Sequence, residues 1–305
     1  MSARVGWGQP TTVIAGCAAR IACDALLNDL VEQHGMNAVT LGPSGTYSHR
    51  AARAVAEGVS FRESVTAIVD AVADGEFQRG VVPIENSIEG SVTETLDALA
   101  SHDIAVVSEI VTPIRHALLA QGESFDTVAS HSQALAQCRT YLEANHPDVT
   151  QEAVASTARG VQYAREDDTV AGIGHPDNAT NGTELTVLAE DIQDQDSNAT
   201  RFFVIAPLSA RSDAGGKSSF IIYPNVNYPG LLLELLEAFA SRDINLSRVE
   251  SRPSGNRLGD YLFHFDIEAG VYEQRVQDAL ADIEELAEAG WVRNLGSYDT
   301  KHVLY

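Results

Sequence analysis

The sequence predicts an α/β fold made of a two-lobed domain and a smaller C-terminal unit in ferredoxin-like order. Short apolar runs alternate with helical patterns from residue 38 to residue 206, which is typical of a sheet with helical crossovers. A segment of serine, alanine, glycine and charged residues at 209–216 has the composition of a linker. Beyond it, strand and helix patterns follow one another in the order βαββαβ.

The first block contains three apolar runs and two helical patterns. We expect strands at 38–41, 80–84 and 104–111, and helices at 47–57 and 92–100. Ligands of such sheets bind at loops beyond the carboxyl ends of strands. The loops after residues 41 and 84 are therefore the first candidates for a site.

A second block of the same kind follows Pro113. Strands are expected at 116–120, 128–129 and 170–173, with another at Val154, and helices at 133–144 and 158–165. Ser156 and Thr157 are favourable residues for the start of the second helix. An apolar strand at 201–206 is expected to return to the first block. The domain 36–208 then has one lobe at about 36–113 and 195–208, a second at about 114–194, and a cleft between them.

The C-terminal unit, expected at 217–305, combines four strand patterns with two helices. Strands are predicted at 219–224, 244–252, 261–267 and 291–295, and helices at 231–239 and 272–289. Alternation of Tyr261, Phe263, Phe265 and Ile267 with polar residues gives its third strand one buried face.

Charge and hydropathy argue against nucleic-acid binding and against a membrane span. It carries 43 acidic and 20 basic residues, a formal net charge of −23, which argues against nucleic acid as a ligand. No run of about 18 apolar residues occurs, so no membrane span is expected. Lys217 and Lys301 are the two lysines, and an acidic, lysine-poor surface is typical of salt-adapted proteins. Such a surface repels itself little at molar salt, where the Debye length is about 3 Å, so we expect a halophilic source.

Cysteine usage and the N-terminal segment point to a protein of a reducing cytoplasm. Cys17, Cys23 and Cys138 form no disulfide framework and no cysteine-rich metal cluster. Residues 1–35 are expected to be a disordered extension or not native, and Arg20 and Asp24 interrupt their apolar stretch, unlike a signal peptide.

Three polar segments carry the functional signals. The Gly42–Ser48 loop joins a strand to a helix start, where backbone N–H groups bind anions. Glu85, Asn86 and Ser87 end a buried strand, and Asn198, Thr200 and Arg201 stand where another begins. Thr200 is a neutral hydrogen-bond donor and Arg201 a possible carboxylate clamp, although each segment is also compatible with a capped turn or an exposed strand end.

Cofactor motifs are lacking. His49, His116 and His131 have no metal-ligand spacing and are expected to be structural or solvent-facing, so no metal site is predicted. Neither a P-loop nor a strand-linked G-x-G-x-x-G occurs. We therefore expect no cofactor.

Together these segments resemble the prephenate dehydratase family. The resemblance rests on Gly42–Ser48, Val82–Gly90, Ser130–Cys138, Ser156–Ala158 and Asn198–Phe202, in the order of that family. After the linker, Tyr228–Leu232 and Glu250–Pro253 resemble the Gly-Ala-Leu and ESRP segments of its ACT regulatory domain. The implied catalytic domain is similar in fold to periplasmic binding proteins.

The resemblance implies conversion of prephenate to phenylpyruvate, water and carbon dioxide without a cofactor, in phenylalanine biosynthesis. Thr200 would assist the departing hydroxyl, and Ser156 and Thr157 would hold a substrate carboxylate. The implied catalytic residues are Thr200, Glu85, Asn86, Ser130 and Gln137. The implied substrate-binding residues are Ser44, Gly45, Thr46, Ser87, Ser156, Thr157, Asn198, Arg201 and Phe202.

The resemblance also implies feedback inhibition by phenylalanine bound to the ACT domain of a homodimer or homotetramer. The residues implied for that site are Asn227, Gly230, Leu231, Leu232, Asn245, Glu250 and Ser251. Leu231 stands where the family often has alanine. Because 1–35 is too short for the chorismate mutase domain of some relatives, we expect a monofunctional enzyme. The alternatives are an arogenate dehydratase, or a non-catalytic binding protein such as a solute receptor or an ACT amino-acid sensor.

Overall fold

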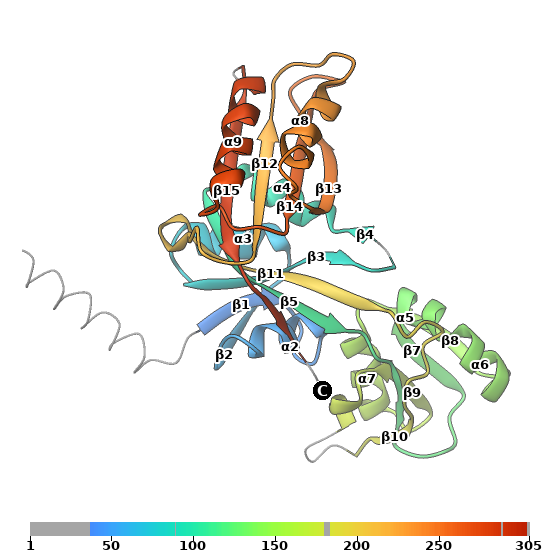
Figure 1. Cartoon of the computed structure of the whole chain (residues 1–305). Helices are drawn as coiled ribbons and strands as arrows, with labels where there is room; N and C mark the ends of the chain where they lie inside the picture. Colours follow the sequence, from blue (N-terminus) through green and yellow to red (C-terminus); the bar gives the residue numbers. More distant parts are fainter. Residues whose placement is uncertain (1–36, 89, 180–183, 288, 304–305) are drawn as a thin grey trace, which may run out of the picture.

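The computed structural model describes residues 37–303 except 89, 180–183 and 288, so the expected N-terminal extension lies outside the described residues. It contains three sheets (Figure 1). The first is a seven-stranded sheet in the order β16-β5-β11-β3-β1-β2, with β4 paired to β3. Its strands are β1 (Asn37–Leu41), β2 (Gly58–Arg62), β3 (Arg79–Asn86), β4 (Gly90–Ser91), β5 (Ile104–Pro113), β11 (Ala199–Pro207) and β16 (Thr300–His302).

The two faces of this sheet are covered differently. Helix α2 (Tyr47–Arg53) covers one face, and its Ala51 and Ala52 pack against Phe202 and Val204 of β11. Helices α3 (Val65–Ala73) and α4 (Thr93–Ser101) cover the other face, together with the C-terminal sheet (Figure 1). β2 and α3 were not predicted from the sequence, although Ser64 caps α3 by accepting a hydrogen bond from the Ala67 N–H.

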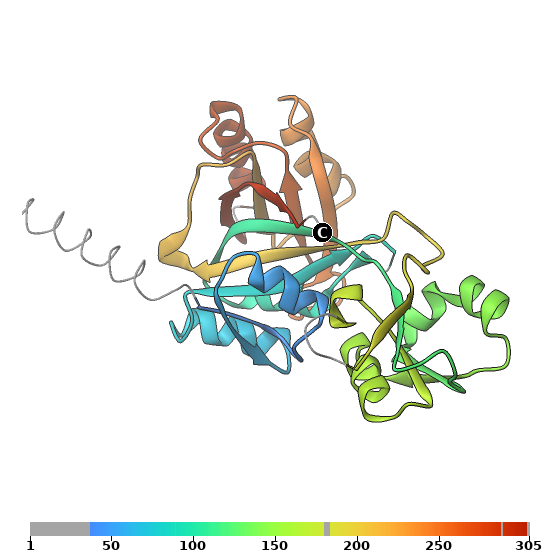
Figure 2. The ribbon, with the colours of Figure 1, turned by 90° about the horizontal axis from the view of Figure 1, so that it is seen from below.

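The second lobe is a five-stranded sheet in the order β10-β6-β9-β7-β8. Two segments join it to the first lobe, one leaving β5 and one entering β11 (Figure 2), and Ala199 pairs with Pro113 where they run side by side. This confirms the expected return of strand 201–206. The elements of the lobe are β6 (Ala117–Ala120), β7 (Thr127–His131), β8 (Thr150–Val154), β9 (Val170–Gly174), β10 (Thr186–Ala189), α5 (Ser132–Gln137), α6 (Arg139–Asn145), α7 (Thr157–Glu166) and the 3-10 helix η1 (Pro176–Ala179).

The single helix expected over 133–144 is instead two helices, broken at Cys138. The reason lies in a distant segment. The Asp194 N–H donates to the Gln137 carbonyl at 2.6 Å, and Asp194 Oδ1 accepts from the Thr140 N–H at 3.3 Å. Backbone groups that would extend one helix are thus satisfied by Asp194, and Gln137 is left at the end of α5.

The third sheet, in the order β13-β14-β12-β15, belongs to the C-terminal unit (217–298). The 3-10 helix η2 (Leu208–Ala210) leads into it. Its elements are β12 (Lys217–Tyr223), α8 (Leu231–Ala240), β13 (Leu246–Pro253), β14 (Tyr261–Ile267), α9 (Gln274–Leu286) and β15 (Trp291–Tyr298), which is the predicted βαββαβ order.

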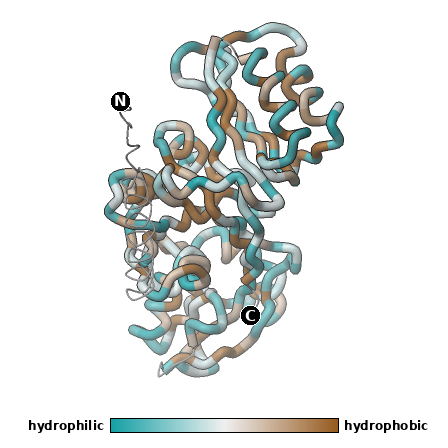
Figure 3. Tube along the Cα trace, turned by 60° about the vertical axis from the view of Figure 1, so that its left-hand side comes forward, coloured by the Kyte–Doolittle hydropathy of each residue, from teal (hydrophilic) through white to brown (hydrophobic). Residues whose placement is uncertain are grey.

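Hydropathy along the chain follows these layers. Apolar residues are concentrated on the strands and inner helix faces, and the loops are mostly hydrophilic (Figure 3). One face of the third sheet packs on α8 and α9. Its other face contributes Ile221, Tyr223, Leu262 and Leu295 to the same core as α3 and α4. The chain then returns to the first sheet, where β16 pairs in parallel with β5, a strand that the sequence patterns did not predict.

Candidate active site between the lobes

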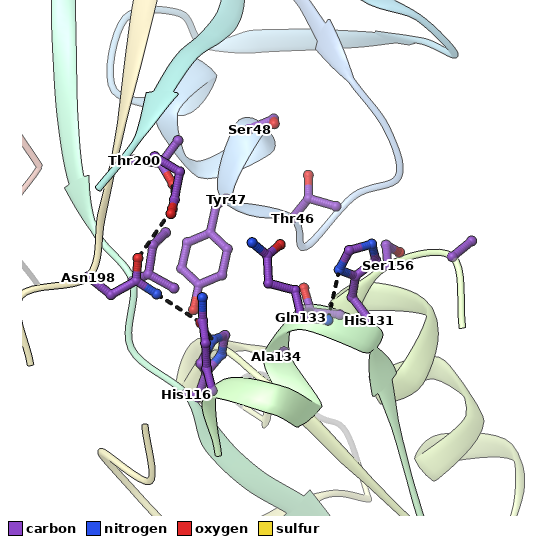
Figure 4. A pocket seen from close by; sticks show the side chains of 15 residues that line it. Thr46, Tyr47, Ser48, His116, His131, Gln133, Ala134, Ser156, Asn198 and Thr200 are labelled. Atoms are coloured by element: carbon purple, nitrogen blue, oxygen red, sulfur yellow. Dashed lines mark hydrogen bonds between the residues drawn. The ribbon is translucent and has the colours of Figure 1, made fainter. Parts of the chain in front are cut away.

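A cavity of about 230 Å³ lies where the two lobes meet (Figure 4). Both lobes and both connecting segments contribute to its lining. Within the residues that the structure describes, the lining holds hydroxyl, amide and imidazole groups but no Asp, Glu, Lys or Arg side chain. The lining residues are Thr46, Tyr47, Ser48, Asn86, Ile114, His116, His131, Gln133, Ala134, Gln137, Ala155, Ser156, Thr157, Asn198 and Thr200.

Strand alternation decides which residues of β3 and β11 reach this cavity. Thr200 lies opposite Asn86 in the antiparallel pair, and both line the cavity. Successive side chains of a strand point to opposite faces. Arg201 and Glu85, the next opposed pair, therefore face away from the cavity, toward the C-terminal unit, where Arg201 binds Asp266.

Hydrogen bonds fix the hydroxyl of Thr200. The Ile88 N–H donates to Asn86 Oδ1 at 2.9 Å, so the amide nitrogen of Asn86 faces the other way. This Nδ2 donates to Thr200 Oγ1 at 3.0 Å and to Asn198 Oδ1 at 3.2 Å. Because Thr200 Oγ1 accepts from Asn86, its own O–H can donate to a molecule in the cavity.

The N-terminus of α7 forms another wall of the cavity. Ser156 caps the helix by accepting a hydrogen bond from the Arg159 N–H at 3.1 Å. Gly160 lets α7 approach β7 closely, because a Cβ there would lie 2.2 Å from the Ala129 carbonyl oxygen. The first N–H groups of the helix, around Thr157, have no partner within the helix, and its dipole favours an anion at this end.

Two histidines line the cavity without a metal-like arrangement. His116 is 2% exposed, and burial lowers its pKa against the opposing effect of its hydrogen bond to Gln137. His131 caps α5, where its Nδ1 accepts from the Gln133 N–H at 3.4 Å. Among the residues that the structure describes, no group of three or more His, Cys, Asp and Glu side chains is placed to hold a metal ion.

The structure brings together half of the residues expected at the catalytic site. Those in the lining are Thr46, Asn86, Gln137, Ser156, Thr157, Asn198 and Thr200. Those outside the lining are Ser44, Gly45, Glu85, Ser87, Ser130, Arg201 and Phe202.

Each of the residues outside the cavity has another place in the fold. Ser130 is fully buried and donates to the Ile173 carbonyl at 2.7 Å, and Phe202 is 1% exposed in the core beneath α2. Ser87 joins two loops, through the Ser197 carbonyl and the Ala199 N–H. Ser44 and Gly45 form the turn before α2, where both hydrogen-bond His49 Nδ1.

Arg201 binds carboxylates of the protein rather than one in the cavity. Its Nε donates to Glu109 Oε2 at 2.6 Å, and an η nitrogen lies 2.7 Å from Asp266 Oδ2. Glu85 is a weaker partner at 3.6 Å. Burial alone would raise the pKa of Asp266, but Arg248 and Arg201 hold it well below its ordinary range. We define the buried ion cluster as Arg201, Glu109, Asp266, Arg248 and Lys217, which joins the first sheet to the C-terminal unit.

Several lining residues were not predicted from the sequence. Gln133 lies four residues before Gln137, which was predicted, and this spacing places both on one helix face, so a signal for Gln133 was available. Tyr47 and His131 lie in two of the segments that carry the resemblance but were not chosen as site residues, and His116 carried no comparable signal. His116 reaches the cavity because it lies on the segment that connects the lobes.

Some of the residues expected at the effector site line a groove in the C-terminal unit, and the others lie outside it. A groove of about 460 Å³ in the C-terminal unit is lined by Asn227, Tyr228, Gly230, Leu231, Leu232, Leu233, Leu236 and Phe263. Ser251 of β13 pairs with Phe263 on the neighbouring strand β14. Asn245 is outside the groove and binds Glu268. Glu250 also lies outside it and accepts from the Ser91 hydroxyl of β4 at 2.9 Å.

Comparison with known proteins identifies a family. The family model described as prephenate dehydratase matches residues 38–209. The bifunctional chorismate mutase/prephenate dehydratase of Aquifex aeolicus is 39% identical, over 85% of this chain and 72% of that protein. The prephenate dehydratase of Methanocaldococcus jannaschii is 36% identical, over 84% and 95%. Arogenate dehydratase 2 of Petunia hybrida is 36% identical, over 90% and 74%.

A solved structure extends the likeness to the whole fold. Prephenate dehydratase from Arthrobacter aurescens, in complex with L-Phe, superposes with a TM-score of 0.78 at 35% identity, covering 87% of this chain and 90% of that one. Within the part of the chain that the structure describes, no helix is both long and apolar enough to cross a membrane.

Proposed function

The chain belongs to the prephenate dehydratase family, and we propose that it converts prephenate to phenylpyruvate, water and carbon dioxide in phenylalanine biosynthesis. In this reaction the ring C–O bond and the bond to the ring carboxylate both break, and the released electron pair completes the aromatic ring. The leaving oxygen takes a proton from solvent and becomes water. The observation that carries the proposal is the orientation of the Thr200 hydroxyl. Its oxygen accepts a hydrogen bond from Asn86, so its O–H can donate to a molecule in the cavity.

Thr200 is the proposed catalytic residue. A hydrogen bond from its O–H would stabilise the negative charge that develops on the departing oxygen, and fixed donors of this kind give large rate effects because they need no reorganisation. Threonine is a weak acid, so we propose stabilisation of the leaving group rather than complete proton transfer by Thr200.

The neutral lining suits a substrate that loses a carboxylate. We propose that Ser156, Thr157 and the N–H groups at the start of α7 hold a carboxylate that the product keeps, with Gln137 and Asn198 supplying further hydrogen bonds. An arginine bound to the departing carboxylate would stabilise the substrate more than the transition state, in which that charge is already moving into the ring. The described part of the lining contains no Arg or Lys, which avoids this cost.

The lining also favours prephenate over arogenate. Arogenate carries an ammonium group where prephenate carries a ketone, and none of the described residues that line the cavity is an Asp or Glu that could pair with it. We therefore expect kcat/KM for prephenate to exceed that for arogenate, measured as phenylpyruvate and phenylalanine formation in molar potassium chloride. Faster turnover of arogenate would replace the proposed substrate, and no turnover of either would favour a non-catalytic binding protein.

We further propose that the C-terminal unit is an ACT domain that binds phenylalanine and inhibits the enzyme. The groove around Gly230 and Phe263 is the proposed effector site, and phenylalanine added to the prephenate assay tests it. Two contacts lead from the ESRP segment to the catalytic domain. Glu250 binds Ser91, and Arg252 makes two hydrogen bonds of 3.0 Å to Asp97 of α4. Ser91 lies on the strand that pairs with Glu85 and Asn86, so movement of the ACT domain would reach the cavity wall.

The chain is proposed to act as a homodimer or homotetramer in the cytoplasm of a halophile. β13 is an edge strand of the third sheet, and Val249 on it is 45% exposed. Leu232 and Leu233 of α8 are also exposed, at 40% and 67%. These apolar side chains suit a contact between ACT domains of two copies.

The proposed salt adaptation predicts a steep dependence on ionic strength. With a net charge of −23, the protein is expected to lose activity and dissociate when potassium chloride falls from molar concentration to about 50 mM, because screening weakens. Initial rates and light scattering over a salt series measure both effects. Full activity of an intact oligomer at about 50 mM salt contradicts the adaptation without affecting the proposed reaction.

A further inference from the structure

Five polar side chains of the cavity form one continuous hydrogen-bonded chain. It runs from Thr200 through Asn86 and Asn198 to Gln137, and ends at His116, on the segment that connects the lobes. Asn198 Nδ2 donates to Gln137 Oε1 at 2.9 Å, and His116 Nε2 lies 3.0 Å from the same oxygen. His116 is therefore tied to the proposed catalytic hydroxyl through three amides.

The orientation of every group in this chain follows from one backbone N–H. The Ile88 N–H can only donate, so the Asn86 atom facing it is Oδ1, and Asn86 Nδ2 faces Asn198. The Asn198 atom that accepts is then Oδ1, which leaves its Nδ2 to face Gln137. The Gln137 atom that accepts from Asn198 is consequently Oε1.

The last step of this sequence assigns the proton on His116. Because Gln137 Oε1 is an acceptor, His116 Nε2 must carry the hydrogen that it shares with this oxygen. Gln137 Oε1 thus receives two hydrogen bonds, from Asn198 and from His116. Both N–H groups of the Gln137 amide are left to donate elsewhere, and Gln137 lines the cavity.

A purely structural role does not explain a histidine at this position. His116 Nδ1 is buried and has no hydrogen-bond partner among the described residues, a situation that costs folding free energy. A phenylalanine would avoid that cost while keeping the edge contact with the Tyr47 ring, whose centroid lies 6.2 Å away. The group that histidine supplies and phenylalanine lacks is the Nε2–H bonded to Gln137.

We propose that His116 is a positioning residue, whose neutral Nε2–H holds the Gln137 amide with its nitrogen directed to the substrate. The proposal rests on the proposed dehydratase activity for its kinetic consequence, but not for the hydrogen-bond arrangement. A Gln137 side chain held only by Asn198 would rotate more freely and would present its oxygen to the substrate part of the time. An acceptor facing substrate carboxylate oxygens is unfavourable, so turnover falls.

The test compares His116→Phe, which keeps the ring and removes the donor, with His116→Gln, which keeps a donor nitrogen at a similar reach. Loss of one neutral hydrogen bond predicts a decrease of roughly tenfold in kcat/KM for His116→Phe and recovery in His116→Gln. His116→Asn, whose amide is one bond too short to reach Gln137, is expected to match His116→Phe. The pair of Gln and Asn variants keeps the test valid if the Phe variant does not fold.

A second mutation separates positioning through Gln137 from a general packing effect. In a Gln137→Met background, His116→Phe should have no further effect on kcat/KM, because the partner through which it acts is gone. His175→Phe is the matched control, since His175 is also 2% exposed and contacts the same Tyr47 ring, and its kcat/KM should stay near wild type. Additive effects of the His116 and Gln137 changes, or equal activity of His116→Gln and His116→Phe, overturn the proposal.

Nitrogen NMR of the imidazole provides a result that does not depend on catalysis. The wild-type protein is expected to show the Nε2–H tautomer of neutral His116, assigned by loss of its signals in His116→Gln. The Nδ1–H tautomer overturns the proposal even if prephenate is turned over. The Nε2–H tautomer in a protein without prephenate turnover contradicts the proposed function instead.

Discussion

Replacement of Thr200 by valine is expected to lower kcat for prephenate by about a hundred- to a thousandfold, with a much smaller change in KM. Valine has nearly the shape of threonine, so the loss reports the hydroxyl that Asn86 orients toward the cavity. Removal of one fixed donor to a developing negative charge typically has an effect of this size. Steady-state phenylpyruvate formation by both proteins in molar potassium chloride measures it.

Thr200→Ser is the matched control, because it keeps a hydroxyl that Asn86 can orient. We expect it to retain most of the activity, while both variants keep the wild-type melting temperature and phenylalanine binding. A valine variant as active as wild type would leave the family assignment intact and remove Thr200 from the mechanism. Equal loss in the valine and serine variants would show that the methyl group, rather than the hydroxyl, is needed.

Replacement of Arg201 by methionine is expected to lower the free energy of unfolding by about 3–5 kcal/mol at neutral pH. Arg201 is the shared partner of Glu109 and Asp266, whose side chains are fully buried. Removal of one member of a buried ion pair leaves an uncompensated charge, which accounts for the size of the effect. Chemical denaturation at constant salt measures it. Arg242→Met, which breaks the more exposed pair with Asp282, is the control and should cost less than about 1 kcal/mol.

The destabilisation by Arg201→Met should become smaller in acid. Burial would raise the pKa of Glu109, but Arg201, Lys217 and Thr300 hold it below its ordinary value, and Asp266 is held low in the same way. A carboxyl group with a lowered pKa in the folded state stabilises the protein above its unfolded pKa of about 4, and this contribution disappears as the pH falls toward the folded value. A difference between variant and wild type that stays constant from pH 7 to below pH 4 would contradict this assignment.

The sequence predicted the strand that holds Thr200 and Arg201 but not the face on which each lies. Alternation places neighbours on opposite sides, and the sequence does not tell which side holds the cavity. Arg201 was interpreted as a clamp for a substrate carboxylate. Its carboxylates, however, belong to Glu109 of β5 and Asp266 of β14, and the approach of those strands to β11 cannot be deduced from local patterns.

The break at Cys138 and the place of His116 show the same limit. Apolar spacing over 133–144 predicts one helix, and the backbone bonds that interrupt it come from Asp194, more than fifty positions further along the chain. His116 belongs to a connecting segment, whose course depends on how both lobes pack. Prediction succeeded where a structural role depends on a local pattern, as with the capping of α7 by Ser156, and failed where the structure depends on contacts between distant segments.

The late position of β11 has a consequence for biosynthesis. This strand lies between β3 and β5 and pairs with both, although the ribosome makes it only after the whole second lobe. Residues 37–113 therefore emerge with a gap in the middle of their sheet, whereas the five strands of the second lobe are contiguous in the sequence and can pair at once. Long-range strand pairing is slow because loop closure must come first. The half of the cavity that carries Thr200 is thus completed only after the second lobe has been made, when β11 inserts between β3 and β5 beside Asn86.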